Sequence, residues 1–224
     1  MGKSGIFTPD SAVMSLETSL RELRTDYVDI FLLHEATVAS ANHEALVETL
    51  LNQVKKGKIR HLGLGSALEK LRGEADLLPA AYDVLQLNDN AVDRSITKLP
   101  NRDRRLVITH SAFAPARLLR QALQAHSQMA REHSLRIGVD LAEPSAISFL
   151  LLRFALWSNP KGIVLFSSKD PQHIAANIRE ADSEPFDDAQ MRRFVEFVDQ
   201  LLEAIGSNLD VSDLHGSRDR SGSS

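Results

Sequence analysis

The fold is decided by the stretch Tyr27-Val28-Asp29-Ile30-Phe31-Leu32-Leu33-His34, a nearly continuous apolar run that stops at a histidine. Apolar runs of this length are typical of strands that are buried on both faces in a parallel sheet. The histidine and the following Glu35 are residues that an apolar core would not select. We therefore expect His34 to lie at the carboxyl end of the strand, where α/β barrels and open α/β sheets bind their ligands.

Four further apolar segments end in the same way. They cover residues 59–65, 82–88, 105–111 and 163–166, and polar residues complete or follow them: Ser66, Asn88, His110 with Ser111, and Ser167 with Ser168. In a parallel sheet, the carboxyl ends of all strands lie on one side. We therefore expect these polar side chains to gather on one surface, which is the candidate functional site.

Helical patterns lie between most of these segments. Thr8-Pro9-Asp10 is a helix-start signal, because it combines a cap, a proline at the first position and an acid near the positive end of the helix dipole. Asn42 is the expected cap of the second helix, and residues 89–104 are expected to form a loop with at most one irregular turn. The expected helices cover residues 9–23, 42–56, about 67–78, 118 to about 133, 146–157, from 171 onward, and about 187–204.

The composition excludes several classes of function. The 224 residues are 43% hydrophobic and carry a net charge of -4, which argues against a nucleic-acid partner or an anionic membrane surface. The sequence contains no cysteine, which excludes disulfides, thiolate zinc sites and a cysteine nucleophile. It also lacks a run long and apolar enough to span a bilayer and a secretory signal at its start, so we expect a cytoplasmic protein.

The number of strands leaves two α/β architectures open. A closed (β/α)8 barrel of the TIM type needs eight strands in about 250 residues, whereas five are predicted here and the sequence opens with a helix. The chain is therefore either a complete open sheet or the later part of a barrel. In both cases we expect a domain over residues 1–205, followed by a disordered polar tail over 206–224.

The helix and strand at residues 19–34 resemble those of the aldo-keto reductase family. Their sequence, S-L-R-E-L-R-T-D-Y-V-D-I-F-L-L-H, matches the family's S-L-x-x-L-x-T-D-Y-V-D helix, which leads into the strand with the catalytic histidine. Three further segments are similar to parts of the family. Residues 56–64 resemble the start of the family's next strand, and residues 84–88 resemble the strand that contacts the nicotinamide. Residues 165–178 resemble the strand and helix that hold the nucleotide. The resemblance runs from about Thr8 to Leu202 and implies an incomplete TIM-type barrel with about five parallel strands and flanking helices.

This resemblance implies hydride transfer from NADPH or NADH to a small aldehyde or ketone, with His34 orienting the carbonyl group. The family's tyrosine, lysine and aspartate belong to early strands, which we expect upstream of this sequence. Tyr27 and Tyr82 fall at strand starts and are not plausible replacements. We therefore expect this chain alone to be inactive or impaired, as a truncated reading frame of a normal reductase or, alternatively, as a re-purposed half-barrel.

The resemblance also implies a set of cofactor-binding residues. Ser167 and His173 stand where NADPH-preferring relatives often carry a lysine and an arginine, so NADP(H) is favoured only slightly over NAD(H). The charged side chains of Arg117, Arg120, Arg192 and Arg193 are interpreted as solvated surface. The expected cofactor contacts are Ser66, Gln86, His110, Ser111, Phe113, Ser167, Ser168, His173 and Asn177.

Two other functions stay open at this point. The first is a non-catalytic fragment that binds a nicotinamide nucleotide or a protein partner. The second is a metal-assisted hydrolase that uses His34, Glu35 and His110, although these residues do not have the spacing of a metal-ligand pair on one element, and no metal is expected. Unpaired strands at the edges of an incomplete barrel also predict pairing with another copy of the chain, and hence a homo-oligomer.

Overall fold

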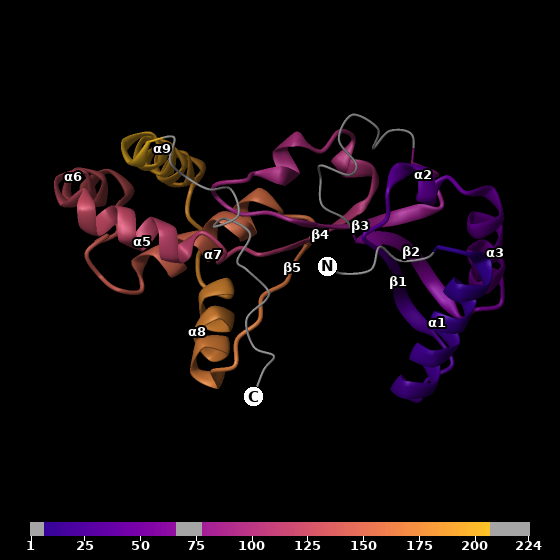
Figure 1. Ribbon diagram of the computed structural model, residues 1–224. Helices are drawn as coiled ribbons and strands as arrows, with labels where there is room; N and C mark the ends of the chain where they lie inside the picture. The colour runs from indigo at the N-terminus through magenta and orange to yellow at the C-terminus, as the bar shows by residue number, and fades with distance from the viewer. Residues whose placement is uncertain (1–6, 66–77, 207–224) are drawn as a thin grey trace, which may run out of the picture. The chain divides into compact units, whose positions relative to one another are not determined.

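The structure is a computed structural model that describes residues 7–65 and 78–206 (Figure 1). Its strands are β1 (Val28–His34), β2 (Ile59–Gly65), β3 (Tyr82–Asn88), β4 (Leu106–His110) and β5 (Ile163–Val164). Its α-helices are α1 (Pro9–Leu23), α2 (Val38–Ala41), α3 (Glu44–Lys55), α5 (Ala116–Ala125), α6 (Ser127–Ile137), α7 (Ala146–Ser158), α8 (Pro171–Ala181) and α9 (Asp188–Ile205). Two 3₁₀ helices, η2 (Ser95–Lys98) and η3 (Arg102–Arg104), lie between β3 and β4.

The strands form one sheet in the order β1-β2-β3-β4-β5, which confirms the predicted α/β fold class. β1 pairs with β2 in parallel, and β2 pairs with β3 in parallel. Because the order in the sheet is the order in the chain, helices and loops connect each strand to its immediate neighbour. This arrangement is the repeating unit of a TIM-type barrel.

The outer strands of the described sheet differ from expectation. In β1 only Leu33 is fully buried, and Ile30, Phe31 and Leu32 are half-buried, so the prediction of a strand buried on both faces was only partly right. β5 is two residues long, whereas an apolar segment over 163–166 was expected. Both strands stand at an end of the sheet order, where only one neighbouring strand among the described residues covers and pairs them.

Helix-start signals in the sequence were informative. Thr8 caps α1 through a capping box, and Asp170 and Asp187 cap α8 and α9 through their carboxylates. The predicted cap at Asn42 was wrong, because His43 caps α3 with its Nδ1, which accepts a hydrogen bond from the Leu46 amide at 3.3 Å. Asn42 instead ends the short helix α2 and donates a hydrogen bond to the Val38 carbonyl.

Two other boundaries also differ from the prediction. The single helix expected to run to about residue 133 is divided into α5 and α6 at His126, and both helices pack on α9. The loop expected over residues 89–104 contains the two short helices η2 and η3. The helix expected around 67–78 lies almost entirely outside the described residues, and the tail expected from 206 lies outside them apart from Gly206.

The described residues divide into two compact units. The first unit comprises residues 7–65, 78–88, 95–109 and 161–163, and the second comprises 89–94, 110–160 and 164–206. Each has its own apolar core. In the first unit, α1 and α3 pack against each other, and α3 packs on β2 (Figure 1). The prediction of one domain over residues 1–205 stays a prediction.

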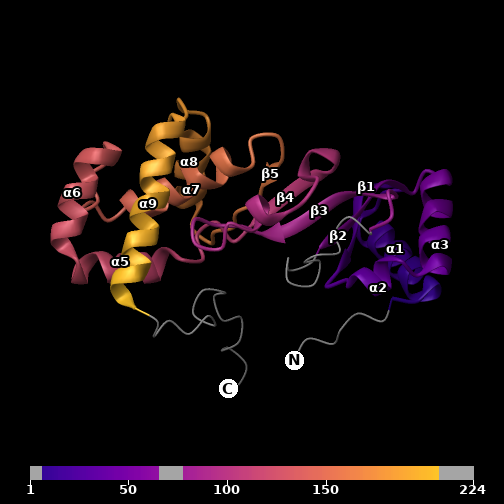
Figure 2. The same cartoon turned by 90° about the horizontal axis from the view of Figure 1, so that it is seen from above.

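The second unit is built around α7. Nine side chains of this helix are buried, as its almost uniformly apolar sequence predicts. α5, α8 and α9 all pack on it, and α9 also crosses α5 and α6 (Figure 2). α7 is therefore the central support of this unit, and α8 lies beside it.

Two glycines of β2 give a matched test of the sheet register. A Cβ atom on Gly63 would overlap Leu32 Cδ2 and lie 2.8 Å from the Val84 carbonyl oxygen, whereas a Cβ atom on Gly65 would make only ordinary contacts. We expect Gly63→Ala to lower the free energy of unfolding by about 1–3 kcal/mol through overpacking. Gly65→Ala should change it by less than about 1 kcal/mol. Urea unfolding of both variants checks this, and equal stabilities would contradict the register.

Candidate functional site

The first group of candidate residues is a row across three strands. Parallel pairing places His34 of β1 opposite Gly65 of β2, and Gly65 opposite Gln86 of β3. A Cβ atom on Gly65 would lie 3.6 Å from His34 Cδ2 and 3.6 Å from Gln86 Oε1. The imidazole and the carboxamide therefore lie on the same face, on either side of a residue without a side chain. We call His34, Gly65 and Gln86 the polar row.

The polar row has the chemistry to hold a carbonyl or amide group. His34 is exposed and Gln86 is half-buried, so both can reach a ligand. A carboxamide offers both a donor and an acceptor, and an imidazole can donate to a carbonyl oxygen. The backbone turns sharply after His34, because Glu35 has a φ of 62° and donates its amide to the Gly65 carbonyl at 2.5 Å. Such left-handed non-glycine residues are frequent at functional sites.

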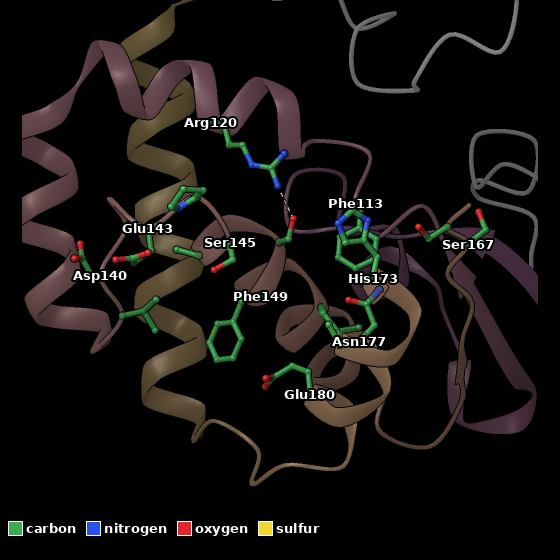
Figure 3. A pocket seen from close by; sticks show the side chains of 17 residues that line it. Phe113, Arg120, Asp140, Glu143, Ser145, Phe149, Ser167, His173, Asn177 and Glu180 are labelled. Carbon is green, nitrogen blue, oxygen red and sulfur yellow. Dashed lines mark hydrogen bonds between the residues drawn. The ribbon is translucent and has the colours of Figure 1, made fainter. Parts of the chain in front are cut away.

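The second group of candidate residues lines a pocket of about 710 Å³ in the second unit. Figure 3 shows Phe113, His173 and Asn177 at one part of this pocket, with Ser167 nearby. The structure thus brings together several residues that were predicted to bind the cofactor. Those that line the pocket are Phe113, Ser167, Ser168, His173 and Asn177.

Local capping interactions place the pocket residues of α8. The Asp170 carboxylate accepts a hydrogen bond from the Gln172 amide at 2.8 Å, and Ser168 Oγ accepts one from the Asp170 amide at 3.1 Å. His173 Nε2 lies 3.7 Å from Asp170 Oδ2. In the following turns, Asn177 and Glu180 return to the same helix face, since residues three and four apart lie together on a helix. One face of α8 therefore forms a wall of the pocket.

The opposite part of the pocket comes from α5 and α7. Arg120 of α5 donates a hydrogen bond to Ser148 Oγ of α7 at 2.6 Å, and its guanidinium points toward the pocket in Figure 3. Phe149 adds an aromatic face, and the carboxylates of Asp140 and Glu143 lie at the far end. The pocket therefore combines hydroxyl groups, a carboxamide, aromatic rings and the Arg120 cation with the carboxylates of Asp140, Glu143 and Glu180, a mixed lining of the kind that small-molecule sites have.

Comparison with known proteins identifies the family. The model of the aldo/keto reductase family matches residues 2–199. The chain belongs to this family. No curated protein matches its sequence significantly.

Solved structures of aldo-keto reductases share the fold of this chain. AKR11C1 from Bacillus halodurans has a TM-score of 0.63 at 16% identity, and the match covers 84% of this chain and 68% of that chain. The glycerol dehydrogenase AKR11B4 from Gluconobacter oxydans has a TM-score of 0.63 at 18% identity, with 90% of this chain and 67% of that chain covered. This chain thus spans about two thirds of their length, and its five-stranded sheet corresponds to part of their TIM-type barrel.

Some predicted cofactor contacts of this aldo/keto reductase chain are not among the pocket residues. His110 and Ser111 lie at and just after the end of β4 and contact each other, with His110 Nδ1 2.7 Å from Ser111 Oγ. Ser111 has a left-handed backbone with a φ of 67°. Ser66 lies outside the described residues. Gln86 belongs to the polar row and not to the pocket, and it is half-buried.

Sequence reasoning missed a cation of the pocket. Arg120 was interpreted as solvated surface, and it is exposed, but it also lines the pocket and contacts Ser148. No sequence signal marks it, because the contact depends on how α5 packs against α7. Glu180 was also missed, although the sequence held a signal for it. Its spacing of three residues from Asn177 places both on one face of α8, and this spacing was the available signal.

Neither tyrosine of the chain lies beside the polar row. Tyr82 is at the start of β3, is only 1% exposed, and its hydroxyl has no hydrogen-bond partner in the part of the chain that the structure describes. This burial raises the pKa of Tyr82 to about 12. Tyr27 precedes β1, and the Arg60 guanidinium lies 4.0 Å from the centre of its ring. Both rings lie at the amino ends of their strands, whereas His34 and Gln86 lie toward the carboxyl ends.

Neither a metal site nor a membrane span is found among the described residues. No three His, Asp or Glu side chains of residues 7–65 and 78–206 come close enough to hold a metal ion. The helices in these ranges are all too short or too polar to cross a bilayer. The structure therefore adds no support to the metal-assisted hydrolase that was considered with His34, Glu35 and His110.

The burial of Tyr82 predicts a specific pH dependence of stability. Its pKa of about 12 in the folded chain lies above the value of about 10 in an unfolded chain, so the folded state keeps the phenolic proton longer. Between these values the free energy of unfolding should fall with rising pH, by about 3 kcal/mol in total. Below pH 10 this contribution is fully present.

Tyr82→Phe removes the titrating group and also the unpaired buried hydroxyl. We expect it to be at least as stable as the parent chain at pH 8 and to lose less stability between pH 10 and pH 12. Denaturant unfolding at several pH values measures both effects. Identical pH profiles for the two chains would show that Tyr82 is not buried as described.

Proposed function

We propose that this aldo/keto reductase chain binds a nicotinamide nucleotide, NADP(H) or NAD(H), for the reduction of a small aldehyde or ketone. The observation that carries the proposal is the pocket of the second unit, where Phe113, Ser167, Ser168, His173 and Asn177 come together. Phe113 is distant in the sequence from the other four, which lie within residues 167–177, and the family resemblance assigned all five to the nucleotide. The polar row supports the proposal independently, because it pairs the assigned histidine with the assigned glutamine.

The residues present fit such a cofactor. A volume of about 710 Å³ is within the range of small-molecule sites, about 300–1,000 Å³. Ser167, Ser168 and Asn177 offer hydrogen bonds to phosphate and ribose oxygens, and Phe113 offers a flat apolar surface. In the polar row, the missing side chain of Gly65 leaves open a space that a Cβ atom would enter. We propose that Gln86 holds the nicotinamide amide at this space.

The cofactor supplies the hydride when it is bound, and the chain supplies orientation. We propose that the exposed imidazole of His34 donates a hydrogen bond to the carbonyl oxygen of the substrate. This contact orients the carbonyl group and stabilises the negative charge that develops on its oxygen. Gln86, on the other side of Gly65, fixes the nicotinamide ring on the same face of the sheet.

A proton donor for the developing alkoxide is not found among the chain's tyrosines. Tyr82 is buried with a pKa of about 12, and Tyr27 lies under Arg60 at the start of β1. We therefore propose that this chain by itself binds the nucleotide but reduces carbonyl compounds slowly or not at all. A non-catalytic binding protein is the alternative function, and it has the same binding site.

The proposal extends to the cofactor preference, the assembly and the compartment. Ser167 and His173 can bond an additional phosphate, and Arg120 brings a cation to the same pocket, which favours NADP(H) slightly.

The outer strands β1 and β5 offer edges that another copy of the chain can pair with, which supports a homo-oligomer. The net charge of -4 supports a partner that is neither nucleic acid nor an anionic membrane, and we propose a cytoplasmic location.

The proposal is tested by titrating the chain with NADPH and with NADH, using the nicotinamide fluorescence as the signal. We expect saturable binding, and we expect Asn177→Ala to weaken it by about tenfold, because one hydrogen bond at the pocket is lost. His61→Ala is the matched control, since His61 is exposed and pairs with Asp83 at 2.6 Å, away from the polar row. Absence of binding by the folded parent chain would contradict the proposed function.

A carbonyl-reduction assay on the same preparation separates the two functions that share this site. Nucleotide binding with little or no reduction of aldehydes and ketones supports an impaired reductase or a non-catalytic binder. Reduction at a rate typical of enzymes, a kcat of about 1 s⁻¹ or more, would exclude the non-catalytic alternative. It would also show that the chain has a proton donor. The assay with His34→Ala then shows whether any residual reduction depends on the histidine.

A further inference from the structure

The helix that carries much of the pocket has no buried side chain. α8 presents His173, Asn177 and Glu180 to the pocket, yet none of its eleven residues is fully buried. Its largest apolar side chains, Ile174 and Ile178, are 37% and 51% exposed. Apolar burial usually fixes a helix on its neighbours, and this stabilisation is small for α8. Another interaction must therefore hold α8 against α7.

A buried arginine of α7 supplies this interaction. Arg153 is 6% exposed, and its guanidinium forms an ion pair with Glu180 of α8. The same guanidinium donates hydrogen bonds to the hydroxyl and the carbonyl oxygen of Ser183, just after α8. Ser183 Oγ in turn lies 2.9 Å from the Glu180 carbonyl oxygen and 3.1 Å from Glu180 Oε1. We call Arg153, Glu180 and Ser183 the α8 clamp.

Two aromatic rings hold the guanidinium in place. The Arg153 Cζ atom lies 5.5 Å from the ring centres of both Phe149 and Phe186. The two rings meet edge to face at 5.4 Å. Cation–π contacts of this kind are stronger when the cation is withdrawn from water. Phe149 and Glu180 also line the pocket, so the clamp lies directly behind the pocket wall.

We propose that Arg153 is a positioning residue for nucleotide binding, which acts through Glu180 and Ser183 to fix α8 at the pocket. This inference rests on the proposed function, because it concerns the end of the nucleotide that Ser168, His173 and Asn177 would hold. Arg153 itself does not line the pocket. Its effect on binding is therefore indirect and requires α8 to carry it.

The geometry explains why arginine is needed at this position. A guanidinium presents several donors in one plane, so it can bind Glu180 and Ser183 together while its faces contact the rings. A lysine ammonium keeps the charge but lacks the plane and the fork of donors. Arg153→Lys should therefore preserve the buried charge pair in part and loosen the orientation of α8. Glu180→Gln keeps the shape of the partner and removes its charge.

The experiment measures binding of the two halves of the nucleotide to the folded chain. ADP and nicotinamide mononucleotide are each used to displace NADPH from the parent chain, Arg153→Lys and Glu180→Gln. We expect both variants to bind ADP about tenfold more weakly than the parent chain does. Their affinity for nicotinamide mononucleotide should stay within about twofold of the parent's. Circular dichroism of each variant shows whether the helices of the second unit are kept, so weaker ADP binding by a variant with unchanged helix content is the readout for positioning.

Arg136→Lys is the matched control. Arg136 pairs with Glu196 at 3.2 Å between α6 and α9 of the same unit, but this pair is exposed and does not contact the pocket. Arg136→Lys should leave the affinity of the chain for ADP unchanged. If the parent chain binds NADPH and both clamp variants bind ADP with the same affinity as the parent, the inference is overturned. Failure of the parent chain to bind NADPH would instead contradict the proposed function.

Discussion

The parallel pairing of β1, β2 and β3, with one register shift between Leu62 and Gly63 in the β2–β3 pair, is the constraint on which the polar row depends. Side chains at paired positions of parallel strands point to the same face of a sheet. The register therefore determines that His34 and Gln86 share a face and that Gly65 lies between them. A shift of one residue would send one of these side chains to the other face. Gly63 opposes such a shift, because only a glycine fits between Leu32 and Val84.

The pocket depends on a different kind of interaction. Its α7 side is supported by a core of fully buried apolar residues, whereas its α8 side is attached through the buried charge of Arg153. Close packing of the buried apolar residues leaves α7 little freedom to move, whereas the attachment of α8 depends on a buried ion pair, which has a large cost when one partner is lost. The pocket thus combines a rigid wall with a wall whose orientation is set by a few polar contacts.

The sequence was sufficient for the parts of the fold that local chemistry determines. The apolar run before His34, the helix-start signal Thr8-Pro9-Asp10 and the apolar residues of α7 all predicted elements that the structure contains. Other features depend on tertiary packing. The break at His126 carries no proline or glycine signal, and the roles of Arg120 and Arg153 arise only when α5 and α8 pack on α7.

Hydrogen exchange of the chain with and without NADPH tests the central claim most directly. If the pocket holds the nucleotide, amide exchange should slow in residues 167–177, and α1 should be unaffected. Binding that leaves residues 167–177 unprotected, or protection confined to other segments, would contradict the account. The measurement requires no turnover, so it is informative even for a chain that does not reduce its substrate.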